Sequence, residues 1–333
     1  MTSRRDHAGR GPADIRIGLS GWTYAPWRGA FYPAELPQRR ELAYAAASFR
    51  SLEINGTFYG LQKPEAYARW AEETPEDFIF AVKAPRFITH VKRLREPEAP
   101  LANFLGSGVL RLGAKLGPIL WQFPPNFAFE EERLAAFLAL LPHDTEAALE
   151  RARRHDARLK APWLAIEGPR RLRHAVEIRH ESFRDPRFLA LLRRHGVALV
   201  CADTVAWPRL MDLAADFAYC RLHGSDELYR SRYADEALDR WALRASCWAR
   251  GLPMRDGDFI APEDSAPDDP GPDDLATARP RDVFVYFDNT DKLHAPEDAR
   301  RLMRRLGQEV VAPDAGAFLA AGPAEEPAAS RPT

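Results

Sequence analysis

Three features are scarce in this 333-residue sequence: cysteine, long apolar runs and net charge. The three cysteines lack CxxC spacing, which predicts reduced thiols in a cytoplasmic protein rather than a disulfide framework. No apolar run approaches the roughly 18 residues of a membrane span, and the N-terminus lacks the apolar segment of a secretory signal. The 47 basic and 48 acidic residues leave a net charge of −1, so charge alone gives no case for a nucleic-acid partner.

What the sequence does contain is a repeated alternation of strand and helix patterns. Short apolar runs that end in polar residues or Gly predict strands. They are IRIGLS from Ile15, SLEIN from Ser51, FIFAVK from Phe78, PILWQF from Pro118, AVEIRH from Ala175, VALVCAD from Val197, AYCRLHG from Ala218 and VFVYFDN from Val283. Most intervals have helical periodicity: Gln38–Phe49, Pro64–Glu73, Leu101–Leu116, Glu130–Leu141, Pro186–His195, Ala234–Arg250 and Pro296–Leu306.

This alternation requires parallel strands joined by crossover helices, and eight such units close a barrel. We therefore predict an α/β fold, a (β/α)8 TIM-type barrel, as a single domain over residues 15–311. An open doubly wound sheet has the same local pattern, but the turn LSGWTYAPW lacks its GxGxxG or GxxxxGK[ST] glycines. Residues 1–14 and 312–333 are predicted to be disordered, with a helical insertion at about 142–173 and an acidic loop insertion at about 255–280.

Polar side chains gather where the predicted strands end. In barrels of this type the chemistry lies at the C-terminal strand ends. Charged residues among apolar neighbours are expected to point into the barrel, where carboxylates need cationic partners. Alternation along each strand gives four groups with a common face: Glu53 with Asn55, Glu177 with Arg179, Tyr219 and Arg221 with His223, and Tyr286 with Asp288.

The sequence therefore predicts a polar pocket at the mouth of the barrel. Its candidate catalytic residues are Glu53, Glu177, Asp288 and His223. Its candidate substrate-binding residues are Trp22, Tyr24, Asn55, Tyr59, Lys83, Gln122, Arg179, Asp203, Arg221 and Asn289.

Several long motifs follow one another along the chain: SGWTYAPWRGAFYP, LEINGTFYGLQKPEAYARW, TPEDFIFAVKAPRFITH, LGPILWQFPPNF, AVEIRHESF and VYFDNTDKLHAPEDARRL. In this order, from about Arg16 to Leu306, they resemble the YecE-like family, domain of unknown function 72. The family's usual pattern has Ser where Gly56 stands and often Asn at the position of Asp288. The resemblance implies a TIM-barrel-like fold and no established reaction.

One hypothesis for the pocket is a metal-assisted enzyme. Oxygen and nitrogen ligands on several strands suit a divalent ion. The sequence has no HxH or HExxH motif here, and His180 is predicted to face away from Glu177. We therefore predict no required cofactor and keep a divalent metal as the lesser alternative, with Glu53, Glu177, Asp203, His223 and Asp288 as candidate ligands.

The favoured hypothesis is a metal-free acid/base and anion site. Lys83, Arg179 and Arg221 would clamp a phosphate or carboxylate, because guanidinium groups hold such anions through two hydrogen bonds. Either Glu53 or Glu177 would be the general base, and either His90 or His223 the general acid. This predicts a hydrolase or isomerase acting on a small anionic, phosphorylated or sugar-like substrate.

Two alternatives need no reaction. The charges can form an internal ion-pair network, or the pocket can belong to a non-catalytic binding protein for a small metabolite or a nucleic-acid element. A modest basic cluster favours nucleic acid, but interleaved acidic residues at Glu96 and Glu98 disfavour it. The cluster is Arg86, Lys92, Arg93 and Arg95.

Overall fold

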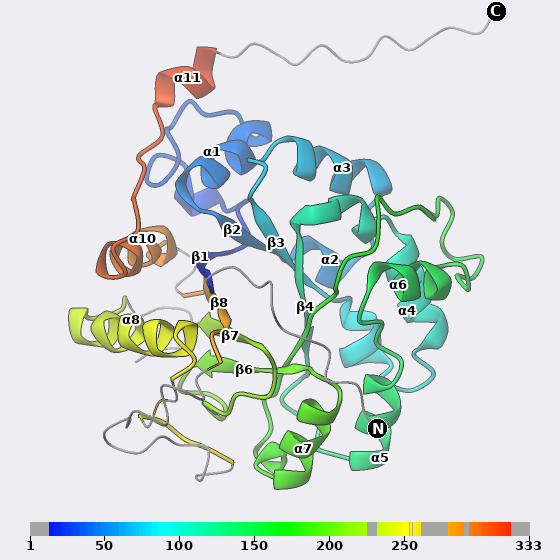
Figure 1. Ribbon diagram of the computed structural model, residues 1–333. Helices are drawn as coiled ribbons and strands as arrows, with labels where there is room; N and C mark the ends of the chain where they lie inside the picture. The colour runs from blue at the N-terminus through cyan, green and yellow to red at the C-terminus, as the bar shows by residue number, and fades with distance from the viewer. Residues whose placement is uncertain are drawn as a thin grey trace, which may run out of the picture.

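A computed structural model describes residues 13–224, 232–252, 254, 256–260, 279–289 and 293–320. Its strands pair in parallel and close into a barrel in chain order, from β1 to β8 and back to β1 (Figure 1). The predicted (β/α)8 barrel is confirmed, and an open sheet is excluded by the β1–β8 pairing. The strands are β1 Ile15–Ser20, β2 Ser51–Ile54, β3 Ile79–Lys83, β4 Leu116–Gln122, β5 His174–Glu177, β6 Ala198–Asp203, β7 Phe217–Leu222 and β8 Asp282–Phe287.

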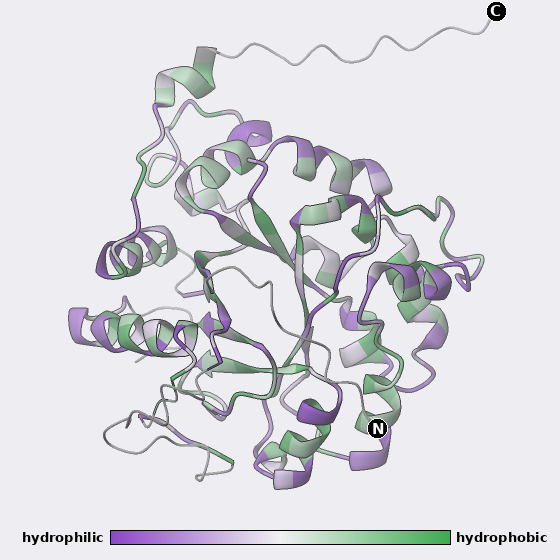
Figure 2. Cartoon of the chain, viewed as in Figure 1, coloured by the Kyte–Doolittle hydropathy of each residue, from purple (hydrophilic) through white to green (hydrophobic). Residues whose placement is uncertain are grey.

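Helices surround this barrel on all sides of the view in Figure 1. In Figure 2 the strands at the centre are mostly hydrophobic, whereas the helices carry hydrophilic residues along with hydrophobic ones. The α-helices are α1 Glu41–Ser48, α2 Gly56–Tyr59, α3 Pro64–Glu72, α4 Glu98–Gly106, α5 Glu131–Leu138, α6 Thr145–Ala152, α7 Pro186–Arg194, α8 Asp235–Ala249, α10 Ala295–Arg305 and α11 Ala315–Ala320. Short helical turns are η1 Ala25–Trp27, η2 Gln38–Arg40, η3 Phe87–Val91, η4 Val109–Lys115 and η5 Glu181–Phe183.

The helix predicted over Leu101–Leu116 is two elements, α4 and η4. They are separated at Gly108, whose φ of 112° lies in the left-handed region that favours glycine. A Cβ at Gly108 would lie 2.6 Å from the Cα of Pro64, so the start of α3 requires glycine here. The break therefore comes from a close tertiary contact that helical periodicity does not reveal.

Two apolar cores follow from the alternation of the strands. One lies inside the barrel and includes Leu120, Tyr219 and Tyr286, while a larger one fills the space between barrel and helices. Gly18 belongs to the tightest part of the barrel, because a Cβ there would lie 2.0 Å from the carbonyl oxygen of Ser51. Above the side chains that fill its lower part, the barrel gathers Glu53, Glu177 and Arg221 near the C-terminal ends of its strands.

The predicted insertions and ends have mixed outcomes. Within 142–173 only α6 is a regular helix, and the chain after it passes Pro162 and Pro169, which lack the N–H of a helical residue. The start of the predicted disordered tail instead forms α11, where Phe318 packs 5.4 Å from Tyr44. The acidic loop lies outside the described residues at 255 and 261–278, and so do residues 1–12 and 321–333. In the described part of the chain, no helix combines the length and apolar character needed to cross a membrane.

Candidate functional site at the barrel mouth

Arg221 lies at the centre of the polar layer at the C-terminal end of the barrel. Its guanidinium donates from Nε to Glu53 at 3.1 Å, from Nη1 to Glu177 at 2.7 Å and from Nη2 to Asp288 at 2.8 Å. We call Glu53, Glu177, Arg221 and Asp288 the mouth cluster. Strand alternation predicted that these side chains point inward, and the structure brings all four together.

Glu53 is held by hydroxyl groups as well as by Arg221. Ser20 Oγ donates to its Oε1 and Tyr219 OH to its Oε2, both at 2.6 Å. Asn55 Nδ2 in turn donates to Ser20 Oγ at 2.8 Å. With Arg221 donating to both of its oxygens, this fully buried carboxylate is fixed in one position.

Glu177 is fixed in a similar way on the opposite side of Arg221. Its Oε1 accepts from Gln122 Nε2 and from Arg179 Nε, both at 2.9 Å. Burial alone would raise the pKa of this carboxyl, but Arg221 and Arg179 hold the pKa well below its usual value. Glu177 is therefore an anion at neutral pH and an unsuitable proton donor.

Lys83 is the cation of the mouth that the carboxylates do not hold. Its Nζ lies 4.2 Å from the centre of the Phe58 ring, and no described residue forms an ion pair or hydrogen bond with it. Burial and the nearby charge of Arg221 lower the pKa of Lys83 to about 8. The amine therefore exchanges its proton close to physiological pH.

His90 packs against Phe58, the same ring that Lys83 contacts, with the two ring centres 5.0 Å apart. Its Nδ1 lies 2.9 Å from Thr89 Oγ1. Burial, followed by the charges of Lys83, Arg179 and Arg86, lowers the pKa of His90 to about 4. The imidazole is thus neutral at pH 7 and can accept a proton, which differs from the predicted general acid. The three side chains whose positive charges lower the pKa of His90 are Lys83, Arg179 and Arg86. We call them the cationic rim.

His223, just beyond the C-terminal end of β7, is fully buried beside the cluster rather than exposed to a substrate. Its Nδ1 lies 3.3 Å from Asp288 Oδ2 and its Nε2 lies 3.4 Å from Arg221 Nη1. Burial and Arg221 lower its pKa, although Asp288 opposes the shift. These contacts suit a residue that positions Asp288 and Arg221 better than they suit the predicted catalytic role.

Trp207 is a residue of the site that the sequence did not predict. The guanidinium of Arg179 stacks 4.0 Å from the centre of its ring, and the ring of His223 lies 5.2 Å away. It lies in the interval after β6, between Asp203 and Phe217, where the sequence predicted no helix. A Trp four residues beyond a strand exit was the available signal, and it gives an aromatic wall beside Arg179.

Two predicted binding residues face the outer helices instead of the mouth. Asp203 accepts from Trp241 Nε1 at 2.9 Å and from Arg209 at 3.0 Å, because Ala202 takes the inward position in β6. Asn289 Nδ2 donates to Asp298 on α10 at 2.9 Å. Both predictions are corrected. Because successive residues of a strand face opposite sides, each of these side chains points away from the barrel interior and joins its strand to a helix.

The predicted aromatic wall is also placed differently. Trp22 packs against Trp70 and Phe80 in the outer core, with ring centres 5.6 and 6.2 Å away. Tyr24 donates its hydroxyl to the carbonyl oxygen of Ser20 at 2.7 Å. Tyr59 is 76% exposed on α2. None of these contacts places the three rings over the mouth cluster.

The proposed metal ligands do not fit a metal centre. Glu53, Glu177 and Asp288 converge on the guanidinium of Arg221, which fills the position that a divalent ion would need. Across the described ranges, no group of three or more His, Cys, Asp or Glu side chains is arranged to hold a metal ion.

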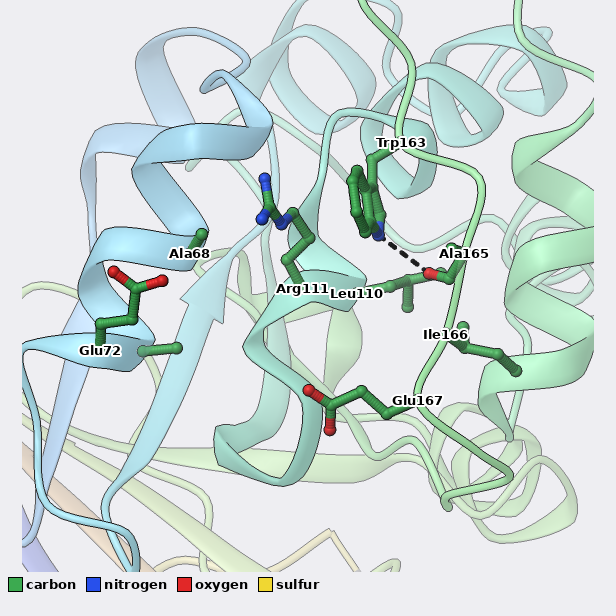
Figure 3. Close-up of a pocket in the computed structure, with 9 residues that line it drawn as sticks. Ala68, Glu72, Leu110, Arg111, Trp163, Ala165, Ile166 and Glu167 are labelled. Carbon is green, nitrogen blue, oxygen red and sulfur yellow. Dashed lines mark hydrogen bonds between the residues drawn. The ribbon is translucent and has the colours of Figure 1, made fainter. Parts of the chain in front are cut away.

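A separate surface pocket of about 370 Å³ lies outside the barrel, between α3, η4 and residues 163–167 (Figure 3). Arg111 stacks on Trp163 at 4.1 Å from the ring centre, and Trp163 Nε1 donates to the carbonyl oxygen of Ala165 at 3.0 Å. None of its lining residues belongs to the mouth cluster or the cationic rim.

Comparisons with known proteins agree with this architecture. Residues 16–321 match the family described as "Protein of unknown function DUF72". The chain is 31% identical over 150 residues to "UPF0759 protein YunF" of Bacillus subtilis (strain 168), which covers 41% of this chain and 50% of that relative. It is 34% identical over 123 residues to "UPF0759 protein YecE" of Escherichia coli (strain K12), which covers 33% of this chain and 43% of that relative. The matches thus span half or less of these relatives' lengths.

Solved structures show the same fold. A DUF72 family protein from Thermotoga maritima MSB8 superposes with a TM-score of 0.64 at 24% identity, over 89% of this chain and 100% of that chain. A DUF72 family protein from Enterococcus faecalis V583 gives a TM-score of 0.60 at 16% identity, over 90% and 99% of the two chains.

Proposed function

Since this chain belongs to the DUF72 family of proteins of unknown function, we propose its activity from its own side chains: the barrel mouth is the active site of a hydrolase or isomerase. Its substrate is a small anionic compound, of which phosphorylated, sugar-like molecules are the main class. Lys83 and Arg179 bind the anion, and the mouth cluster beneath them holds the site in shape.

The observation that carries this proposal is the order of charges with depth. Glu53, Glu177 and Arg221 are fully buried and paired with one another. Lys83 is 9% exposed, and the side chain of Arg179 is 13% exposed. A molecule that approaches the mouth therefore meets the cationic rim first, and an anion gains most from these contacts in a partly buried site.

The predicted roles of several residues change under this proposal. Arg221 was expected to clamp the substrate, but its N–H groups already bind carboxylates and Ser20. Glu53 and Glu177 act as its partners rather than as general bases. Proton transfer instead falls to Lys83, whose pKa of about 8 lies near the operating pH. The neutral ring of His90, with its pKa lowered to about 4, is left to orient the substrate by a hydrogen bond.

A non-catalytic binding protein is the second candidate, because the mouth cluster is so completely paired that it can be purely structural. The two candidates share the anion site and differ in turnover. Incubation with sugar phosphates, followed by detection of a changed product, separates them.

Thermal shift with glycerol 3-phosphate tests the anion site. We expect a concentration-dependent rise in melting temperature at low ionic strength, lost in Lys83→Met and in Arg179→Gln. Arg187→Gln is the matched control, because Arg187 is 66% exposed on α7 and contacts Glu131, Asp185 and Phe129 rather than the mouth cluster. An equal response of all four proteins, or no response of any, would refute the proposal.

A further inference from the structure

We propose that the Lys83 amine is a nucleophile that forms a Schiff base with the carbonyl carbon of an aldehyde or ketone substrate. This deepens the proposed function and rests on it, because it names the reactive group of the anionic substrate. The geometry that carries it is the position of Nζ at the C-terminal end of β3, over the Phe58 ring.

Lys83 has no hydrogen-bond or ion-pair partner among the described residues, although it lies in a site rich in carboxylates; its Nζ lies over the face of the Phe58 ring instead. Arg221 binds Glu53, Glu177 and Asp288, and Arg179 binds Glu177 a second time. Among the described residues, none accepts a hydrogen bond from Lys83 Nζ. A lysine kept for stability in such a site would be expected to pair with one of these carboxylates.

Burial of Lys83 favours the neutral amine. Loss of water around Nζ, followed by the nearby charge of Arg221, lowers the pKa of Lys83 to about 8, although the Phe58 ring face and the carboxylates of the mouth cluster favour the charged form. An amine with this pKa is about 9% neutral at pH 7, compared with about 0.03% for an ordinary lysine. Only the neutral amine has the free electron pair that attacks a carbonyl carbon.

The reaction balances without a redox partner. The nitrogen electron pair forms a bond to the carbonyl carbon, and the π electrons of the C=O bond move to oxygen. A proton passes from nitrogen to this oxygen, which gives the neutral carbinolamine. The hydroxyl group takes up a second proton and leaves as water while the nitrogen electron pair forms the C=N bond, and the iminium nitrogen then loses a proton in return. Amine and carbonyl thus give imine and water, with no oxidant or reductant.

The cationic rim decides which carbonyl compounds fit. Arg179 stacks on Trp207, and its side chain is 13% exposed. A substrate with a carbonyl at one end and a phosphate or carboxylate at the other can present the carbonyl to Lys83 and the anionic group to the two arginines of the rim. Phosphorylated aldoses and ketoses of a few carbons have this chemistry.

The chain provides its own control for a shifted lysine. Burial also lowers the pKa of Lys115, but its Nζ donates to the carbonyl oxygens of Ala71 and Thr74, outside the barrel. Lys63 and Lys160 are exposed. If a lowered pKa alone made a lysine reactive, Lys115 would react as Lys83 does.

The experiment is reductive trapping of the whole protein with glyceraldehyde 3-phosphate and cyanoborohydride at pH 7, followed by peptide mass spectrometry. We expect at least about tenfold more adduct on Lys83 than on Lys63, Lys115 or Lys160. Glycerol 3-phosphate, which has no carbonyl, should suppress the adduct by competition. In Lys83→Arg, which keeps the charge but lacks the amine, the total adduct per chain should fall to the background carried by the other lysines.

The outcomes separate the two proposals. Adducts spread evenly over the lysines, with a thermal shift by glycerol 3-phosphate intact, overturn the Schiff base and leave the anion site standing. A Lys83 adduct that forms equally well with unphosphorylated glyceraldehyde and resists competition supports the nucleophile and overturns the anion site. Even labelling without any thermal shift overturns both.

Discussion

Replacing Arg221 by Met removes the cation that three carboxylates share. Arg221 and two of its partners, Glu53 and Glu177, are fully buried, so the change leaves uncompensated negative charge where water cannot reach it. Breaking a buried ion pair from one side costs about 3–5 kcal/mol. With ion-pair distances of 2.7 to 2.9 Å to three carboxylates, we expect a loss in the upper half of this range.

The loss should depend on pH. In the native protein the pKa of Glu177 lies below its ordinary value of 4.5, despite burial, because of Arg221 and Arg179. Its stabilising contribution is therefore present above about pH 4.5 and is lost as the pH falls through the folded-state pKa. Without Arg221, burial is opposed mainly by Arg179, so the pKa of Glu177 rises above its native value and the ionised carboxylate costs the variant more stability as the pH rises. The difference between the two proteins should be larger at pH 7.5 than at pH 5.

Urea unfolding followed by circular dichroism at both pH values measures this difference. Arg221→Met combined with Glu177→Gln should recover about 0.5–3 kcal/mol, because the orphaned charge is then removed as well. Arg187→Met should stay within about 0.5 kcal/mol of the native protein, as expected for an exposed side chain. An Arg221→Met variant within 1 kcal/mol of native at both pH values would show that the mouth cluster is not a buried ion-pair network.

Three further predictions concern single features of the mouth. Burial lowers the pKa of Lys83 to about 8, so the unfolded chain binds more protons than the folded one between about pH 8 and 10.5. The free energy of unfolding should therefore rise with pH in this window. The rise should be absent from the unfolding curves of Lys83→Met. Tyr59→Ala should leave both the melting temperature and the glycerol 3-phosphate response unchanged, since the side chain is 76% exposed, and a lost response would return Tyr59 to the site. Mg²⁺, Mn²⁺ or Zn²⁺ should not raise the melting temperature, whereas a saturable rise would mean that an ion displaces Arg221 from its carboxylates.

The barrel could be predicted because its two signals are local. Apolar runs set the strands, and period-two alternation placed Glu53, Glu177 and Arg221 on the inner face before any contact was known. The prediction for Asp203 was wrong because the same alternation was not applied to β6. In this strand Ala202 points inward, and Asp203 points toward α8. A charged residue at the end of a strand was expected to lie at the mouth. Whether its side chain points into the barrel or toward the helices depends instead on its position in the alternation.

The chemistry of individual side chains could not be predicted, because it depends on which groups pair. Nothing in the sequence shows that Arg221 takes up all three carboxylates and so leaves Lys83 over Phe58. Trp207 was missed for the same reason, since its stacking on Arg179 joins two loops that are distant in the chain. Competition among charges within one small volume is a tertiary property.

The central claim is that the cationic rim, and not the buried cluster, receives an anionic ligand. Isothermal titration calorimetry of glycerol 3-phosphate at low ionic strength and pH 7 tests it most directly. We predict one site per chain, with affinity reduced at least about tenfold in Lys83→Met and in Arg179→Gln and unchanged in Arg187→Gln. Binding of equal strength in all four proteins, or none in the native protein, would contradict it.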